Sequence, residues 1–468
     1  MTKKKLYVDI HVIQTVPPSC INRDDTGSPK TAVYGGVRRA RVSSQSWKRA
    51  MRLMFNEHFD SMKLGQRTKD IIGLVSEQMP DGHEINGVRL EDAIREVINL
   101  ASADEKKPII PDVTYEGIKK ALKKMTKEEN DADAETELVN ELKTAIATLI
   151  QDIDTVRKVD ALFKSIDNRL NSISDKKDHV GRKEFELDIL EALLKAPCVL
   201  DSAGATSDAL FFIGRREATN IAELVTKYCS DKSQITKKQV QEALNYYPDK
   251  DSVPCHAVDV ALFGRMVAKS PVLNADASAQ VAHAISTHKV ENEFDYYTAV
   301  DDRAPEDNAG AGMIGTVEFS SSTLYRYSTV AVHDLFGQLA KDSQSTAEVI
   351  KEFAKVFVIS MPTGKQNTFA NRTLPNSVMI TIRADQPVNL VGAFESPIVI
   401  PLSHANGYAE ASSKKLAEYA KKTYETFAPK PVKSWQIGYG LEEIGERQDL
   451  HTALDELEKT IREELVNI

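Results

Sequence analysis

Two strand-like stretches separated by about two hundred residues of charged helical sequence constrain the fold of this chain most strongly. Residues Leu6–Ile13 alternate and are rich in branched side chains, which predicts a strand ended by Pro17–Pro18. A loop with several glycines is expected over 19–42, and Ser43–Ser44 can then cap a helix. Residues 60–250 are typical of charged amphipathic helices. The clearest examples are Leu90–Leu100, Tyr115–Met125, Glu135–Ile150 and Glu184–Leu194.

Strand-like sequence resumes after this helical insert. The pattern predicts a strand at Ala257–Phe263, one long strand or two at Val317–Val332, a helix at Ser345–Phe357, a loop at Pro362–Pro375, a strand at Val378–Ile382, and helices at Tyr408–Phe427 and Leu450–Val466. The order predicts an α+β fold with a split β-α-β arrangement of the ferredoxin or RNA-recognition type. We expect a discontinuous sheet domain over 1–60 and 250–400, a helical insert over 61–249, and C-terminal helices over 401–468.

Charge is unevenly distributed along the chain. The whole sequence carries a net charge of −9, but residues 1–55 hold eleven Lys and Arg against three Asp and Glu. In the expected helix, Trp47, Met51 and Phe55 form a buried stripe with Ala50 and Met54, while its cations face outward near an N-terminus that itself attracts anions. The basic residues are interleaved with glycines and hydroxyls, a mixture suited to phosphates. They are Arg23, Lys30, Arg38, Arg39, Arg41, Lys48, Arg49 and Arg52.

Several function classes are disfavoured. No run approaches 18 apolar residues and the first residues lack a signal-peptide pattern, so we expect a cytosolic protein. The four cysteines form no paired C-x-x-C, which argues against a zinc site. Gly310–Gly315 fits a dinucleotide fingerprint but neither follows a strand nor opens a helix, and Gly364–Lys365 lacks the remainder of a phosphate loop. We expect no cofactor and no metal.

Two further features have competing interpretations. Asp24–Asp25 can act as a nuclease carboxylate pair, although such pairs more often cap turns or contact arginines. Tyr296–Tyr297 lies in a polar stretch, where the two rings can either stack on bases or anchor local packing.

Several ordered blocks closely resemble the CasC family of the RAMP superfamily, the backbone subunits of the type I-E CRISPR Cascade complex. The two N-terminal blocks are Asn22–Lys30 and Tyr34–Ala50. The later ones are Asp259–Met266, Ala282–His288, Phe294–Asp302, Glu318–Ser321, Tyr325–Tyr327 and Gly364–Thr368. Two features depart from the family pattern: the insert looks longer than usual, and Tyr296–Tyr297 stands where Trp or Phe is expected.

The resemblance implies an RNA-recognition-like palm, helical fingers and a thumb over 268–316, in a subunit that polymerises along guide RNA with other Cascade subunits. It implies that Arg23, Lys30, Ser43, Gln45, Lys48 and Arg52, with Arg49 as a further candidate, contact the guide backbone. Arg38 and Arg41 belong to the same basic block. Met266, Tyr296 and Tyr297 would lie at a displaced base, and Lys365 and Gln366 beside the RNA.

The expected function is therefore non-catalytic. The subunit would hold the guide while base pairing reads target DNA in antiviral defence. One alternative is an RNA-cleaving backbone subunit of the type III kind that uses Asp24 or Asp25. Another is a stand-alone RNA-binding regulator.

Overall fold

The protein is described from a computed structural model, which covers residues 5–79, 84–85, 88–102, 211–230, 235–245, 255–267, 273–299, 313–400, 407–442 and 444–466. The chain forms two compact units, one of residues 1–97 with 203–468 and the other of residues 98–202. Nearly all described residues belong to the first unit. The expected helices at 115–125, 135–150 and 184–194 lie outside the described residues. The expected domain boundaries stay a prediction.

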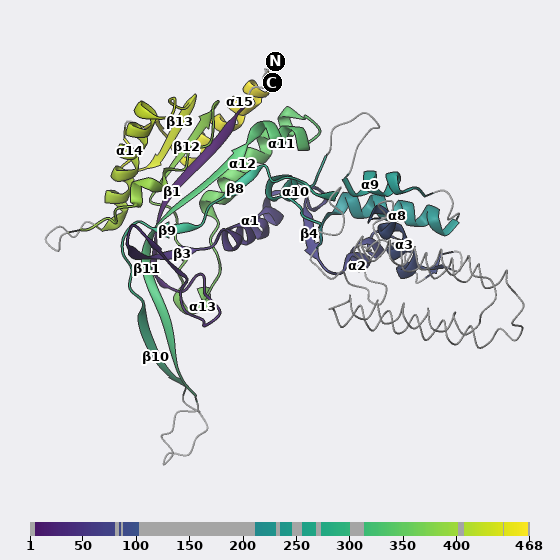
Figure 1. The fold of residues 1–468 in the computed structure, drawn as a ribbon, viewed down its shortest axis with the longest axis horizontal. Helices are drawn as coiled ribbons and strands as arrows, with labels where there is room; N and C mark the ends of the chain where they lie inside the picture. The colour runs from purple at the N-terminus through teal and green to yellow at the C-terminus, as the bar shows by residue number, and fades with distance from the viewer. Residues whose placement is uncertain are drawn as a thin grey trace, which may run out of the picture. The chain divides into compact units, whose positions relative to one another are not determined.

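A large mixed sheet organises the first unit (Figure 1). Its strands are β1 (Tyr7–Ser19), β2 (Thr31–Tyr34), β3 (Val37–Val42), β8 (Ala279–Val281), β9 (Ala284–Ser286), β10 (Glu293–Ala299), β11 (Met313–Ala331), β12 (Ser377–Arg383), β13 (Lys433–Gly438) and β14 (Glu446–Arg447). The order across the sheet is β14-β13-β12-β1-β11-β9-β3-β2. Because β1 is antiparallel to both β11 and β12, the strands follow the order expected of a split β-α-β arrangement. The predicted α+β class is confirmed.

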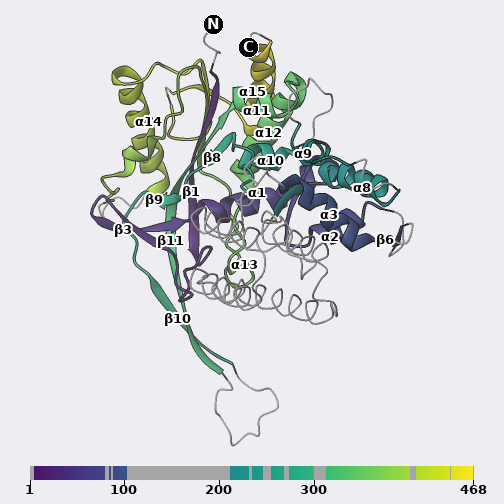
Figure 2. The same cartoon turned by 45° about the vertical axis from the view of Figure 1, so that its right-hand side comes forward.

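Helices cover both faces of this sheet (Figure 2). The described helices packed near it are α1 (Ser44–His58), α10 (Val258–Phe263), α11 (Val332–Gln338), α12 (Ser343–Ile359), α13 (Gln366–Phe369), α14 (Tyr408–Thr426) and α15 (Leu450–Leu465). Alternation along β1 sends Val8, Ile10 and Val12 into a core with α1, α12 and α15. Ile13 lies in a second core with α14 and the 3₁₀ turn Leu390–Phe394. Both faces of the central strand are therefore covered from Val8 to Gln14.

A smaller group of elements adjoins α10. It comprises the 3₁₀ turn Ser61–Lys63, β4 (Gly65–Thr68), α2 (Ile71–Ser76), β5 (Glu84–Ile85), β6 (Val88–Arg89), α3 (Leu90–Ser102), β7 (Phe211–Gly214), α8 (Arg215–Ser230) and α9 (Lys237–Asn245). Strand β4 pairs with β7, so residues on either side of the long insert meet in one two-stranded sheet. The buried Arg265 guanidinium donates to Glu217 at 2.8 Å and to the Leu273 and Leu244 carbonyls, which ties α8 and α9 to the segment after α10.

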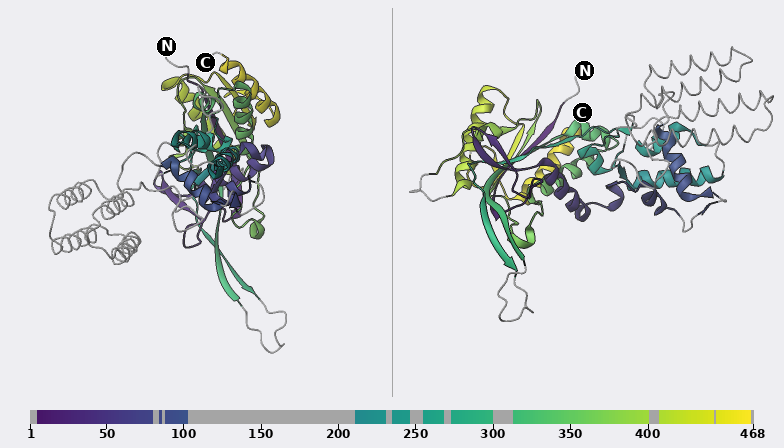
Figure 3. Two further views of the ribbon diagram at one scale, coloured as in Figure 1. Left: turned by 90° about the vertical axis from the view of Figure 1, so that its right-hand side faces the viewer. Right: turned by 60° about the horizontal axis from the view of Figure 1, so that its bottom comes forward.

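Beyond the main sheet, β10 and the first part of β11 continue as a two-stranded hairpin (Figure 3). Every residue of β10 is exposed, whereas β11 is buried from Leu324 to Val330. One strand of nineteen residues therefore spans both the hairpin and the core of the sheet, which confirms the expected strand over 317–332 in its longer form.

The structure corrects three local predictions. Pro17–Pro18 lie within β1, where the pairing register shifts between Val16 and Ser19; a bulge tolerates residues that cannot donate. The expected loop at 19–42 contains the hairpin β2–β3, closed by Gly35 and Gly36, both at positive φ. Residues 258–263 form α10 and no strand, because an apolar run that is buried all round has no diagnostic period.

The C-terminal region also differs from the expected pair of helices. Helices α14 and α15 are present, but β13 and β14 lie between them and extend the sheet beside β12. Trp435 of β13 is fully buried in the core that contains α15. The end of the chain therefore contributes to the same sheet as its beginning.

Candidate nucleic-acid interface

Asn22 holds the basic loop against the start of α1. Its side-chain oxygen accepts a 2.9 Å hydrogen bond from the Ser43 backbone N–H, and its carbonyl accepts a 2.9 Å bond from the Lys30 N–H. The Arg41 N–H in turn donates to the Lys30 carbonyl, which ties the loop to β3. The loop between residues 22 and 30 is thus closed at its base and fixed to the helix N-terminus.

Within that loop the Asp24 carboxylate is engaged by its own turn. Its Oδ1 accepts bonds from the Thr26 hydroxyl at 2.7 Å and from the Thr26 and Ser28 backbone N–H groups at 3.0 Å. The Thr26 hydroxyl is the main cause of a lowered pKa for Asp24. This arrangement matches a turn-capping carboxylate. Among the described residues, no cluster of three or more acidic, His or Cys side chains is arranged to hold a metal.

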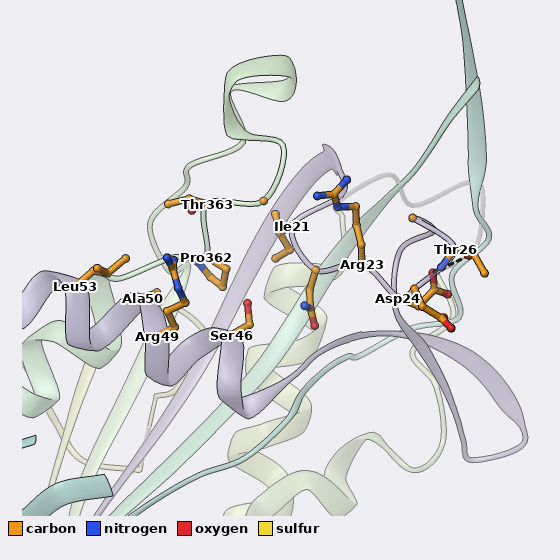
Figure 4. A pocket seen from close by; sticks show the side chains of 14 residues that line it. Ile21, Arg23, Asp24, Thr26, Ser46, Arg49, Ala50, Leu53, Pro362 and Thr363 are labelled. Carbon is orange, nitrogen blue, oxygen red and sulfur yellow. Dashed lines mark hydrogen bonds between the residues drawn. The ribbon is translucent and has the colours of Figure 1, made fainter. Parts of the chain in front are cut away.

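The closed loop, α1 and the segment 362–364 surround an open hollow of about 550 Å³ (Figure 4). Arg23 and Asp24 line it from the loop, and Ser46 and Arg49 from α1. Arg49 rises from the helix toward Pro362 in the close-up view. The backbone at Gly364 approaches the loop so closely that a Cβ there would lie 2.4 Å from the Ile21 carbonyl oxygen. This close contact fixes the third wall of the hollow.

The N-terminal turn of α1 carries no acidic residue, so its positive end is uncompensated by its own sequence. Ser43 is the N-cap residue, as predicted, but its side chain makes no capping hydrogen bond and is buried. Gln45 and Arg49 are exposed on the helix. Hydroxyl, amide and guanidinium groups beside a helix N-terminus can all donate hydrogen bonds to a phosphate oxygen.

Lys48 and Arg52 do not face freely outward as expected, and both are partly buried. The Lys48 Nζ lies 5.7 Å from the centre of the Phe263 ring, and the Arg52 guanidinium 4.5 Å from that of Phe212. Arg52 Nε also donates to Asp259 at 3.4 Å. These two positions border the buried stripe of α1, so their stems pack against α10 and β7.

The arginines of β3 have different environments. Arg39 is fully buried and donates to the Tyr34, Ser286, Phe394 and Glu395 carbonyls, so it is a structural residue and cannot contact phosphate. Arg38 is exposed. Arg41 is half-buried, with its guanidinium 3.3 Å from His283 Nδ1. Burial is the main cause that lowers the pKa of His283, and the charges of Arg41 and Lys30 lower it further. The two cations therefore lie beside a neutral ring.

The expected pair Tyr296–Tyr297 is divided by the strand. Successive side chains of β10 point to opposite faces, so Tyr296 pairs across to Thr316 and Tyr297 to Gly315 on the other face. The two rings therefore start from opposite faces of the hairpin. Their side chains are 65% and 38% exposed, and Met266 is 81% exposed. Gly315 leaves room for the Tyr297 ring, because a Cβ there would lie 2.5 Å from the tyrosine oxygen.

Lys365 and Gln366 stand at the start of α13. Lys365 adopts a left-handed backbone conformation with φ of 53°, and Gln366 is exposed. Lys365 follows Gly364, so it adjoins the third wall of the hollow. Contact between RNA and any of the predicted site residues stays a prediction.

A family model described as CT1975-like protein matches residues 8–463. The chain belongs to the CT1975-like protein family. A chain of a solved structure described as "CRISPR RNA-guided surveillance complex, pre-nicking" is 26% identical with a TM-score of 0.61, over 97% of this chain and 100% of that one. Another, described as "CRISPR RNA-guided surveillance complex", is 24% identical with a TM-score of 0.49, over 97% of this chain and 98% of that one. No curated protein matches.

These findings support a subunit of the Cas kind, as the sequence resemblance indicates, but they do not specify CasC or type I-E. Among the described residues of this CT1975-like protein, no helix is long and apolar enough to cross a membrane.

Sequence reasoning missed three residues of the interface. Asn22 lies in the resembling block, and its anchoring role needs Ser43 and Lys30 to be brought beside it. Ser46 lines the hollow one helical turn before Ala50. Arg67 on β4 lies over the same Phe212 ring as Arg52 because β4 pairs with β7, and no local sequence pattern reveals this arrangement.

Proposed function

We propose that this CT1975-like protein is a guide-RNA-binding subunit of a CRISPR surveillance complex of the Cascade kind. The observation that carries the proposal is the polar hollow of about 550 Å³, into which Arg23, Arg49 and the N-terminal turn of α1 converge. The likeness to a chain of an RNA-guided surveillance complex at 26% identity supports the same assignment.

In this proposal the interface binds the RNA backbone and makes no sequence-specific contact with the bases. Arginines and a helix N-terminus contact phosphates, which carry no sequence information. The covered sheet supports this mode, because α14 and the 390–394 turn occupy the face that other RNA-recognition folds use to stack bases. Copies of the chain would line up along one guide, and base pairing would read the target DNA.

In this proposal the main sheet would be the palm, and the described elements between α1 and α10 would belong to the fingers. The hairpin of β10 and β11 would be part of the thumb. Since Tyr296 and Tyr297 lie on opposite faces of the hairpin, only one of them would meet a displaced base, and Tyr296 is the more exposed.

We further propose that the subunit does not cleave RNA. The three hydrogen bonds that Asp24 accepts from its own turn favour a structural role. The alternative predicts periodic cuts in complementary RNA that disappear in Asp24→Asn or Asp25→Asn. We expect intact complementary RNA after incubation with the assembled complex, and such cuts would overturn the non-catalytic proposal.

The principal experiment removes the two arginines of the hollow. Arg23→Gln with Arg49→Gln should weaken binding of single-stranded RNA and reduce the salt dependence of log K by about 0.7 per lost phosphate contact, so by about 1.4. The matched control is Arg447→Gln with Arg462→Gln, which removes two exposed arginines elsewhere. Equal slopes and affinities for the two double variants would refute the proposal.

Oligomeric state on RNA separates this function from a stand-alone regulator. Native mass measurement on RNAs of increasing length should show the number of bound copies rising with length. A complex that remains at one copy per RNA would favour the regulator.

A further inference from the structure

Arg326 is a fully buried arginine on β11. It is directly opposite Val12 of β1, so its side chain points to the face of the sheet that α1 and α12 cover. Its guanidinium carbon lies 3.8 Å from the centre of the Trp47 ring of α1 and 4.7 Å from that of the Phe357 ring of α12. One buried cation thus contacts both helices.

The same guanidinium holds the end of α12. Its Nη1 donates to the Val358 carbonyl at 3.4 Å, and its Nη2 donates to the Phe357 carbonyl. Both carbonyls lie in the last turn of the helix, where main-chain oxygens lack a helical partner and the helix dipole attracts a cation. Helix α12 ends at Ile359, and Pro362–Gly364, the third wall of the hollow, follow shortly after it. Arg326 therefore fixes the point from which this wall starts.

Gln14 of β1 extends the contact to the loop after α13. Its Oε1 accepts a 2.6 Å bond from Arg326 Nη1, and its Nε2 donates to the Thr373 carbonyl at 2.9 Å and to the Thr373 hydroxyl at 3.2 Å. That hydroxyl donates in turn to the Thr15 carbonyl at 2.8 Å. Trp47, Arg326, Gln14 and Thr373, called the Arg326 network below, thus join α1 to the segment beyond the third wall.

Stability alone does not account for a cation at this place. Burial lowers the pKa of Arg326 from 12.5 to about 9, so the charged form is disfavoured there. Among the described residues, its Nε also has no hydrogen-bond acceptor. An apolar side chain would avoid both costs. Apolar contacts have no direction, however, whereas a guanidinium donates in fixed directions and so fixes the relative places of α1, α12 and β1.

The network contacts the walls of the hollow from behind. Ser46 and Arg49, which line the hollow, lie on either side of Trp47 along α1 (Figure 4). Because Trp47 is fully buried, its ring fixes the rotation of α1 about its axis, and with it the directions of Ser46 and Arg49. No member of the Arg326 network itself lines the hollow. The network can therefore affect a bound ligand only through the walls.

We propose that Arg326 is a positioning residue for the hollow, which sets the rotation of α1 through Trp47 and the opposite wall through Gln14 and the end of α12. The proposal rests on the proposed function, because the ligand that it concerns is the RNA bound in the hollow. It makes the affinity for RNA depend on a side chain that cannot reach RNA.

The experiment compares Arg326→Lys and Gln14→Met with the control Arg383→Met in the full chain. Arg383 is another fully buried arginine of the main sheet, but it donates to the Gln386 and Pro429 carbonyls, which do not line the hollow. Lysine keeps the charge but lacks the planar fork that serves several acceptors and a ring together. Each network variant should weaken binding of single-stranded RNA about fivefold, as the loss of one ordinary hydrogen bond would. The control should bind like the wild type.

Binding is measured at a temperature at which circular dichroism shows every variant to be folded. A double-mutant cycle then shows whether Arg326 acts through α1. In the Arg49→Gln background, Arg326→Lys should weaken binding less than it does in the wild type, because the guanidinium that it positions is already absent. A general structural defect would weaken binding by the same factor in both backgrounds, and if Arg326→Lys does not fold, Gln14→Met enters the same cycle. Equal factors, or network variants that bind like Arg383→Met, would overturn the proposal.

A second measurement needs no RNA. Hydrogen exchange followed by mass spectrometry should show faster exchange of residues 360–376 in Arg326→Lys and Gln14→Met than in Arg383→Met, while α15 exchanges alike in all three. If the wild-type chain bound no RNA, the proposed function would fail. The role of Arg326 in placing the wall would then be supported by this selective exchange and overturned by its absence.

Discussion

Asp9 provides a sharp test of the energetics of the sheet, because it is a fully buried carboxylate on the central strand. Its Oδ1 accepts a 3.0 Å bond from the Tyr327 hydroxyl, and its Oδ2 a 2.9 Å bond from the Val388 N–H. Burial is the main cause that raises the pKa of Asp9 from 3.8 to about 6, and both hydrogen bonds oppose it. Ionisation in the folded chain therefore costs about 3 kcal/mol more than in the unfolded chain, at about 1.36 kcal/mol per tenfold change.

The sign of the pH effect follows from proton binding. Between pH 3.8 and about 6 the folded chain keeps the proton on Asp9 while the unfolded chain loses it. Stability therefore falls as pH rises through this window and levels off above it. In Asp9→Asn the group cannot ionise, and an amide can still accept from Val388 and donate to Tyr327. The free energy of unfolding of wild type relative to Asp9→Asn should fall by about 2.4 kcal/mol between pH 4 and pH 7, because a smaller part of the effect lies below pH 4.

Urea unfolding followed by tryptophan fluorescence measures this difference, since Trp47 and Trp435 are both buried in the main core. Glu57→Gln is the control, because Glu57 is exposed on α1 and this variant also replaces one carboxylate by an amide. A difference between wild type and Asp9→Asn that stays constant from pH 4 to 7 would refute the reasoning.

Two stability predictions concern the walls of the hollow. Gly364→Ala places a methyl group 2.4 Å from the Ile21 carbonyl oxygen and should destabilise the chain by about 2 kcal/mol. Gly337→Ala, where the added Cβ meets nothing within 4 Å, should be neutral or stabilising in the same thermal melt; equal melting temperatures for the two variants would contradict the close approach. Asn22→Ala leaves the Ser43 N–H without its acceptor and should cost about 1 kcal/mol in urea unfolding, with weaker RNA binding. Asn56→Ala on the exposed side of α1 should cost less, and the reverse order would show that Asn22 does not anchor the loop.

Periodicity predicted the helices α1, α3, α12, α14 and α15 and three strands of the main sheet, β1, β11 and β12, but not the seven other strands of that sheet. The stripe Trp47, Met51 and Phe55 is buried as its spacing of four residues indicates, since period and burial are the same physical signal in a surface helix. The fully apolar stretch at 258–263 has no such signal, and only tertiary packing decides that it is helical. The hairpin of β2 and β3 was overlooked although Gly35–Gly36 is a strong turn signal, because charged residues interrupt the alternation.

The sequence predicts which segments form the candidate site, but it predicts less well which side chains in those segments are exposed. Sequence resemblance identifies the basic loop and the helix that together line the hollow. It does not distinguish exposed Arg38 from buried Arg39, because that difference depends on carbonyls more than two hundred residues away. The opposite orientation of Tyr296 and Tyr297 follows from strand alternation alone, once the segment is assigned to a strand.

The burial of Arg39 separates two electrostatic roles that a count of charges combines. The described hydrogen bonds of its guanidinium end on main-chain oxygens, so it releases no counterion when nucleic acid binds. Its positive charge still contributes to the field outside the protein, and such a field accelerates encounter with a polyanion. In this chain, buried cations such as Arg39 therefore contribute to the rate of association with nucleic acid. The salt dependence of the affinity, in contrast, reflects only the cations that contact phosphate.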